Sequence, residues 1–350
     1  MSEPVVIGGG GLEASRRFSP ARLLRILFGL TAVLAAAVVA SAFLGVERID
    51  PAAALSSPDS LDARILFGLR LPRLVLGMIA GAALSAAGAA YQGLLRNPLA
   101  DPFVLGVSGG AALGGTLALV AGSLAGGALL QGGALVTAAA FAGAVLATLL
   151  AFAAGSTRGR LDPTRTLLAG VVFNSFAAAA ITILKTAVSP EKAQELLFWL
   201  TGSLGYESWG TLAAAGAATL VAAAVLARQG HALNLLVLGD DAAAALGVEV
   251  ARVRLIVFAA ASLAVAVAVS LTGMVAFVGL IVPHLARLAF GPDQRLLVPA
   301  SAIGGAAFLL LADLGARLLF VPLGTELPAG AITAIAGGPF FLLLMRRRSP

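Results

Sequence analysis

Residues 69–77 read LRLPRLVLG and place two arginines, Arg70 and Arg73, at the start of a long apolar run. From Leu74 onward the chain stays apolar long enough to cross the hydrocarbon core of a bilayer as a helix, which takes roughly 20 residues. Membrane proteins concentrate Lys and Arg on the cytoplasmic side. The side on which these two arginines lie therefore bears on both the fold and the function.

The composition of the whole chain is that of an integral membrane protein. Of its 350 residues, 59% are hydrophobic and 11% are charged, against about 25% charged in a typical soluble domain. The formal net charge of +6 comes from arginines in loops between apolar runs, so we attribute it to orientation in the lipid bilayer and expect no nucleic-acid partner. The chain has no cysteine, which excludes disulfides and thiolate metal sites, and we expect no bound metal.

Ten apolar runs have about the length of membrane spans, which predicts an all-α integral membrane protein with ten transmembrane helices. Two of the runs, 103–120 and 275–288, are short and marked by glycine. The segment 193–205 is amphipathic and too short to span, so we expect it to form a helix at one surface. The ten runs begin near Leu23, Leu74, Phe103, Leu129, Leu167, Thr211, Leu255, Val275, Leu296 and Pro328.

The distribution of Lys and Arg predicts that both termini are cytoplasmic. An even number of spans puts the two ends on the same side, and both 16–25 and 346–348 are rich in arginine. Alternating the loops then assigns 16 of the 23 Lys and Arg residues to the inside and 7 to the outside. Arg70, Arg73 and Arg317 fall on the outside, against this trend.

The three outer arginines have two interpretations. An arginine near a helix end can extend its charged group into the lipid head-group layer without any further role. Three of them together, two flanking Pro72, can instead form a receptor for carboxylates, because guanidinium groups make paired planar contacts with acids. Asp313 and Arg317 are also spaced i, i+4 on one helix, which predicts an internal ion pair that lowers the cost of placing Asp313 in a span.

Two segments contain proline breaks beside short spans. In 91–115, YQGLLRNPLADPFVLGVSGGAALGG, the pairs Asn97-Pro98 and Asp101-Pro102 interrupt the helix twice. The segment 279–295, GLIVPHLARLAFGPDQR, has a similar short span followed by a polar turn. An ordinary tight loop explains either one alone, but broken segments in both halves of a chain point to a translocation pathway.

The segment 233–254, LNLLVLGDDAAAALGVEVARVR, lies on the cytoplasmic side of the predicted topology. We expect one short helix over 234–238, a break at Gly239, and a second helix that Asp240 caps and that ends at Gly247. Two short helices across the surface look like a docking site for a soluble partner, although a re-entrant or surface-packed linker has the same pattern.

Two other functional classes have weak support in the sequence. GVSGG (106–110) matches the G-x-S-x-G pattern, so an intramembrane serine protease with Ser108 as nucleophile and His284 as base is one alternative. An ion-driven transporter needs a mid-membrane carboxylate, for which Asp313 is the acidic candidate, but an arginine lies close to it. No G-x-x-x-x-G-K-[ST] sequence occurs, so any ATP hydrolysis that drives this protein takes place on another chain.

Six blocks in this chain resemble, in order, those of the FecCD-type permeases, the membrane subunits of type II ABC importers for ferric siderophores, haem and vitamin B12. The resemblance runs from about residue 20 to residue 347. The blocks are RLPR (70–73), NPLADPFVLGVSGGAALGG (97–115), LLAGVVFNS (167–175), VLGDDAAAALGV (237–248), AFVGLIVPHLARL (276–288) and LLLADLGARL (309–318).

The resemblance implies the type II ABC importer fold, with a second copy of the chain, two cytoplasmic ATPase subunits that bind ATP and Mg, and a periplasmic substrate-binding protein. It implies no cofactor on this chain. Docking of the binding protein is assigned to Arg70, Arg73 and Arg317. Coupling to the ATPase is assigned to Val237, Leu238, Gly239, Asp240, Asp241, Ala245, Leu246 and Gly247. The cytoplasmic gate is assigned to Asn97, Pro98, Leu99, Pro163 and Thr164, where RLDPTRT (160–166) departs from the usual serine-rich pattern of the family.

We therefore expect a cytoplasmic tail over 1–20 and a single transmembrane permease domain over 21–350, with coupling helices at about 234–248. The protein is expected in the inner (plasma) membrane as a transport subunit and not as an enzyme. Its expected cargo is an iron chelate such as haem or a ferric siderophore, with vitamin B12 as the alternative.

Overall fold

The computed structural model describes residues 18–46, 49–57, 59–125, 133–157, 160–325 and 327–346. Within these ranges the chain is helical apart from its loops and one antiparallel pair of two-residue strands. The elements in chain order are α1 (Pro20–Phe43), α2 (Pro51–Ser56), α3 (Leu61–Ile65), a π-helical turn (Leu66–Arg70), α4 (Leu71–Leu94), a 3-10 turn (Pro102–Leu105), α5 (Val107–Ala125), α6 (Gly133–Gly155), β1 (Ser156–Thr157), β2 (Arg160–Leu161), α7 (Pro163–Lys185), α8 (Pro190–Leu200), α9 (Trp209–Arg228), α10 (Gly230–Leu236), α11 (Asp240–Ala245), α12 (Val250–Thr272), α13 (Val278–Phe290), α14 (Gln294–Leu323) and α15 (Ala329–Arg346).

The predicted all-α membrane fold is confirmed. In the described part of the chain, 7 helices are long and apolar enough to cross a membrane. Three shorter apolar helices, in α5, α13 and α15, occupy the places of the third, eighth and tenth predicted spans. The count of ten spans and the cytoplasmic position of both termini stay predictions. Most of the expected tail, residues 1–17 of 1–20, lies outside the described residues.

Several helices begin a few residues before or after the predicted start of their apolar run, for reasons visible in the backbone. The third apolar run begins its helix at Val107 and not at Phe103, because a 3-10 turn precedes it and Gly106 adopts a φ of +89°. The fifth begins at Pro163, four residues before Leu167, because the Asp162 side chain accepts hydrogen bonds from the first free N–H groups of the helix.

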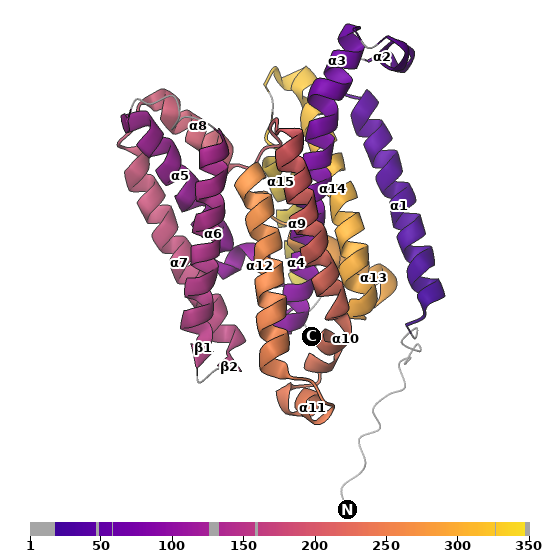
Figure 1. Cartoon of the computed structure of the whole chain (residues 1–350), viewed down its shortest axis with the longest axis vertical. Helices are drawn as coiled ribbons and strands as arrows, with labels where there is room; N and C mark the ends of the chain where they lie inside the picture. Colours follow the sequence, from indigo (N-terminus) through magenta and orange to yellow (C-terminus); the bar gives the residue numbers. More distant parts are fainter. Residues whose placement is uncertain are drawn as a thin grey trace, which may run out of the picture.

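The centre of the bundle consists of α4, α12 and α14. Of the residues in their most apolar stretches, 83%, 72% and 67% respectively are buried, against 17% for α1 and 11% for α7. In Figure 1, α5, α6 and α7 form a group on one side of α12, and α1 lies at the opposite edge beside α14. The exposed faces of α1 and α7 are thus available to lipid or to another chain.

Small residues let the central helices approach closely. A Cβ atom on Gly81 of α4 would overlap the carbonyl of Gly305 on α14, so only glycine fits at this contact. Close backbone approach through small residues is the usual way in which helices gain packing energy in lipid. The α4–α14 contact is also the most extensive between any two of the described helices.

The two ends of the bundle carry different short elements, which Figure 1 separates clearly. At one end, α2 and α3 lead through the π-helical turn into α4; we call this the arginine end, because Arg70, Arg73 and Arg317 lie there. At the other end lie α10, α11 and the β1–β2 pair; we call this the α11 end.

The contact between α4 and α14 gives a first prediction. Gly81→Ala should lower the free energy of unfolding by about 1–3 kcal/mol, because the new methyl group forces two backbones apart. The measurement is the thermal midpoint of the purified protein in detergent. Gly29→Ala is the matched control, since a Cβ at Gly29 in α1 meets no atom within 4 Å and alanine favours helix. Equal midpoints for the two variants would contradict the close approach.

Candidate functional site

A fully buried carboxylate organises the arginine end. Asp313 on α14 has no exposed surface and accepts hydrogen bonds from Arg73 on α4, with Nη2 at 2.8 Å and Nε at 3.1 Å from Oδ1. The Arg317 Nε lies 3.1 Å from Asp313 Oδ2, so the predicted i, i+4 ion pair is confirmed. Two arginines share one carboxylate, and the group as a whole keeps a positive charge.

Two of these arginines also hold the end of α1. Arg70 Nη1 donates to the carbonyl of Ala42 at 2.8 Å, and Arg317 Nη2 donates to the carbonyl of Ser41 at 3.1 Å. The last carbonyls of a helix have no partners within it and carry the negative end of its dipole, so two guanidinium groups stabilise this end. A Cβ on Gly45 would lie 3.2 Å from Arg70 Nη2, so glycine leaves room for them.

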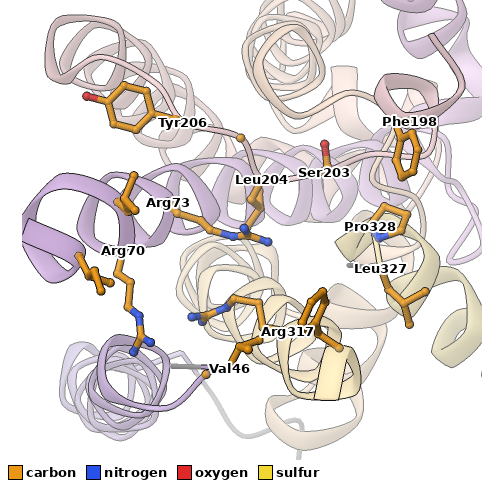
Figure 2. A pocket seen from close by; sticks show the side chains of 15 residues that line it. Val46, Arg70, Arg73, Phe198, Ser203, Leu204, Tyr206, Arg317, Leu327 and Pro328 are labelled. Atoms are coloured by element: carbon orange, nitrogen blue, oxygen red, sulfur yellow. The ribbon is translucent and has the colours of Figure 1, made fainter. Parts of the chain in front are cut away.

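The three arginines line one cavity of about 730 Å³. Figure 2 shows the guanidinium groups of Arg73 and Arg317 approaching one another from different helices, while Arg70 points toward α1. Arg70 and Arg317 are only 8% and 9% exposed, so their charged groups bind protein atoms and do not simply extend into lipid head groups. The rest of the wall is mostly apolar, with Val46, Ile65, Leu69, Phe198, Leu204, Tyr206, Phe320, Leu327 and Pro328.

The α11 end contains the two short helices expected from the sequence, with corrected bounds. The first is α10, Gly230–Leu236, and not 234–238; the second is α11, Asp240–Ala245. Gly239, with a φ of +116°, occupies the N-cap position. The expected capping role of Asp240 was therefore wrong, because Asp240 is the first helical residue. Gly247, with a φ of +87°, follows the end of the helix as expected.

The remaining predicted coupling residues lie on or beside α11. Val237, Leu238 and Leu246 are large apolar side chains that are each more than half exposed, and Asp241 is exposed in the first turn. Exposed apolar groups beside carboxylates at a helix start form a surface suited to another protein.

Asp240 binds two arginines from other parts of the chain. Its Oδ1 atom accepts from Arg96, which follows α4, and from Arg254 Nη2 on α12 at 2.8 Å. Arg254 is nearly buried, with 7% of its side chain exposed, whereas the side chains of Arg96 and Asp240 are 36% and 41% exposed.

A second polar cluster fixes α10 to the start of α14. Asn234 Nδ2 donates to Asp293 Oδ1 at 2.7 Å, and Asn234 Oδ1 accepts from the backbone N–H of Gln294. Burial alone would raise the pKa of Asp293, but hydrogen bonds from Arg295 and Asn234 outweigh it and hold that pKa below its ordinary value.

The predicted gate residues are in two different settings. Asn97, Pro98 and Leu99 form a turn after α4, in which Asn97 Oδ1 accepts from the N–H of Leu99 at 2.9 Å. Pro163 and Thr164 precede the predicted start of the fifth run near Leu167, but they are the first two residues of α7. Proline is favoured at the first helical position because its missing N–H would have no partner there.

The alternative protease interpretation has no support in the geometry. The Ser108 hydroxyl donates to the carbonyl of Phe103 at 3.1 Å, within its own segment. His284 on α13 contacts the ring of Phe340, with the ring centroids 6.0 Å apart. A serine nucleophile needs a base at its hydroxyl, and the contacts of Ser108 do not provide one. The ion-driven alternative also fails, because Asp313 is already paired with two arginines.

The comparison with known families decides the class of this protein. The model of the FecCD transport family matches residues 33–347. The chain belongs to the FecCD transport family. It is accordingly a transport component, the permease of an ABC importer. It is a multi-pass protein of the inner membrane.

Individual relatives agree with this assignment. The cobalamin import system permease of Halobacterium salinarum is 42% identical over 287 residues, covering 82% of this chain and 74% of the relative. The hemin transport system permease of Yersinia pestis is 37% identical over 284 residues, covering 81% and 84%. A solved structure described as an inward-facing metal-chelate type ABC transporter superimposes with a TM-score of 0.78 at 32% identity, covering 93% of this permease and 99% of that chain.

Several pairings within these sites did not emerge from the sequence. Arg73 and Asp313 are 240 positions apart, and Arg96 and Asp240 are 144 apart, so no local spacing indicates either pair. Arg254 did have a local signal, since an arginine in the first turns of an apolar helix needs a partner. Its partner, Asp240, lies only 14 positions earlier.

Removal of the buried carboxylate is expected to destabilise the permease strongly. Asp313→Asn leaves Arg73 and Arg317 without their shared counter-charge, and breaking a buried ion pair typically costs roughly 3–5 kcal/mol. The measurement is the thermal midpoint in detergent. Glu249→Gln is the control, because the Glu249–Arg252 pair is 72% and 74% exposed and should contribute little. Equal effects of the two substitutions would contradict the role of Asp313 as the shared partner of the two arginines.

The cluster at α10 predicts a pH dependence. The pKa of Asp293 is lowered in the folded state, so its charge stabilises the fold above the unfolded pKa and that stability is lost as the pH falls through the folded pKa. Asp293→Ala should therefore reduce the thermal midpoint at pH 7, and the difference from the wild type should shrink below about pH 4. The exposed Asp241→Ala serves as control. A difference that is constant with pH would contradict the role of the charge.

Proposed function

We propose that this permease is the transmembrane subunit of an ATP-driven importer that moves an iron chelate, such as haem or a ferric siderophore, from the periplasm to the cytoplasm. In this proposal the arginine end faces the periplasm and the α11 end faces the cytoplasm. Two separate ATPase subunits hydrolyse ATP with Mg, and a periplasmic binding protein delivers the cargo.

The observation that carries this proposal is the cationic cavity at the arginine end. Three guanidinium groups and one carboxylate, that of Asp313, leave it with an excess of two positive charges. Carboxylates on the two lobes of a binding protein would find paired donors in Arg70, Arg73 and Arg317. Complementary charge of this kind speeds encounter and fixes the orientation of the docked partner.

The same charge favours an anionic cargo. Haem carries two carboxylates on an apolar ring, which suits a mouth that combines arginines with apolar walls. Vitamin B12 is the second candidate, because a cobalamin permease is among the relatives at 42% identity, against 37% for the hemin permease.

A second copy of the chain completes the pathway in this proposal. A cavity of about 510 Å³ opens between α5 and α7 and includes the polar side chains of Ser108, Asn174 and Ser175. Polar side chains within membrane spans usually face the interior of a bundle or a water-filled cavity and not lipid, so we place a copy of the permease across α7, with the translocation pathway between the two. The gate is then formed by Asn97–Leu99 and by Pro163–Thr164 at the end of this space.

The α11 surface supplies the contact with the ATPase. The exposed Val237, Leu238 and Leu246 give an apolar patch, and the carboxylates of Asp240 and Asp241 lie at the start of the helix. A soluble ATPase subunit that binds here reaches the permease without entering the lipid.

An uptake assay tests cargo and docking together. The permease, its ATPase and its binding protein are reconstituted in proteoliposomes, and ATP-dependent uptake of haemin, a ferric hydroxamate and cyanocobalamin is compared. Uptake of an iron chelate is the expected result. Arg70→Gln keeps a donor for the Ala42 carbonyl but removes the charge, so it should weaken binding of the loaded binding protein about fivefold.

Two controls make the assay decisive. Arg64→Gln removes an exposed arginine on the neighbouring α3 and should leave docking unchanged. High salt should weaken docking to the wild type, because exposed charge pairs are screened. Uptake of cyanocobalamin alone would replace the iron chelate with the second candidate, and equal binding by the wild type and Arg70→Gln would remove Arg70 from the docking site.

A further inference from the structure

Arg96 has an unusual backbone conformation at the end of α4. Its φ is +50°, one of two positive values among non-glycine residues in the described chain. The N–H of Arg96 binds the carbonyl of Gly93 and that of Asn97 binds the carbonyl of Gln92, the pattern of a Schellman motif. Glycine is the usual residue here because other side chains strain this conformation. A strained position kept by a long charged residue indicates a role for that side chain.

The side chain of Arg96 reaches the first residue of α11. It donates to Oδ1 of Asp240, and the same oxygen accepts from Arg254 on α12. Arg254 is almost buried and fixed in a central helix, whereas the side chain of Arg96 is exposed, in the turn that follows α4. Asp240 thus lies between Arg254, which is fixed, and Arg96, which has room to move.

The turn after Arg96 is tied by consecutive short-range bonds. Asn97 Oδ1 accepts from Leu99 N–H, Ala100 N–H binds the Asn97 carbonyl, and Asp101 Oδ1 accepts from Phe103 N–H. A segment bonded at nearly every step moves as a unit when one end is displaced.

The far end of this unit is bonded to α7. The carbonyl of Phe103 accepts from Asn174 Nδ2 at 2.8 Å and from the Ser108 hydroxyl at 3.1 Å. Asn174 lies on the helix whose first residues are Pro163 and Thr164. These contacts therefore connect α11 with the first segment assigned to the gate and with α7, the helix that begins with the second.

We infer that Asp240 and Arg96 are positioning residues that couple α11 to the gate. Displacement of α11 by the ATPase moves Asp240, which draws Arg96 and the 97–103 segment with it and shifts α7 through Asn174. Arg254 holds the other side of Asp240 and sets its resting position. This inference rests on the proposed function, in which α11 contacts the ATPase and Asn97–Leu99 form a gate.

The test uses a thiol at the gate of the assembled complex. The chain has no cysteine, so Leu99→Cys provides the only thiol of each permease chain. Its rate of modification by a membrane-impermeant maleimide is measured from the ATPase side, without nucleotide and with ATP and vanadate. Arg96→Gly and Asp240→Asn are then added singly and together, with Arg96→Lys as the conservative variant.

Arg96→Gly separates the side-chain role from a structural one. Glycine suits the positive φ, so the thermal midpoint should stay equal or rise, while the nucleotide-dependent change in thiol reactivity should fall by roughly tenfold. Arg96→Lys should restore part of it. The double variant should be no worse than Asp240→Asn alone, because both substitutions remove the Arg96–Asp240 contact and Asp240→Asn in addition weakens the contact with Arg254. The control, Glu249→Gln with Arg252→Gln, removes a nearby exposed ion pair that does not reach the gate.

The outcomes separate this inference from the proposed function. A nucleotide effect that survives in Arg96→Gly, or effects of Arg96→Gly and Asp240→Asn that add, would overturn the coupling alone. Leu99→Cys that responds to no nucleotide state in an otherwise unaltered complex would overturn the gate and the coupling with it. Loss of response in the Glu249/Arg252 control as well would also overturn the coupling, since any change at this surface would then have the same effect.

Discussion

The buried charge of Asp313 constrains the arrangement of the bundle. A carboxylate taken out of water costs several kcal/mol unless opposite charges and hydrogen bonds surround it. Here the compensation comes from Arg73 on α4 and Arg317 on α14, and Arg317 in turn holds the end of α1. The depth and rotation of three helices are therefore coupled, because any slip between them separates a charge from its partner.

Helix α14 connects the two functional ends. Its 30 residues span about 45 Å, enough to cross the hydrocarbon and reach both surfaces. Its first turn is held by Asn234 from α10, and its last turns carry Asp313 and Arg317. In the proposed function, a partner acting on α10 and a binding protein docked at the arginines would contact the same rigid element. No mobile segment is needed between these two ends.

The sequence was sufficient for the class of fold and for most of the elements. Apolar length and the i, i+4 spacing are local properties, so the helices and the Asp313–Arg317 pair could be predicted. The partners of Arg73 and Arg96 could not, because they depend on which helices become neighbours. The start of α10 at Gly230 was missed for a different reason. The chain turns from α9 into α10 at Gln229 without a proline, and the glycine packs against the backbone of Arg295.

The two ends differ in how easily their ion pairs can exchange. The Asp313 carboxylate is fully buried and its arginines are 22% and 11% exposed, so breaking this cluster uncovers charges in an apolar setting. The Arg96–Asp240 pair is 36% and 41% exposed, so water can replace either partner at small cost. Breaking ion pairs therefore costs the least free energy at α11 and the turn after α4. In the proposed function, the arginine end is the fixed frame against which movement of α11 and that turn would open or close the gate.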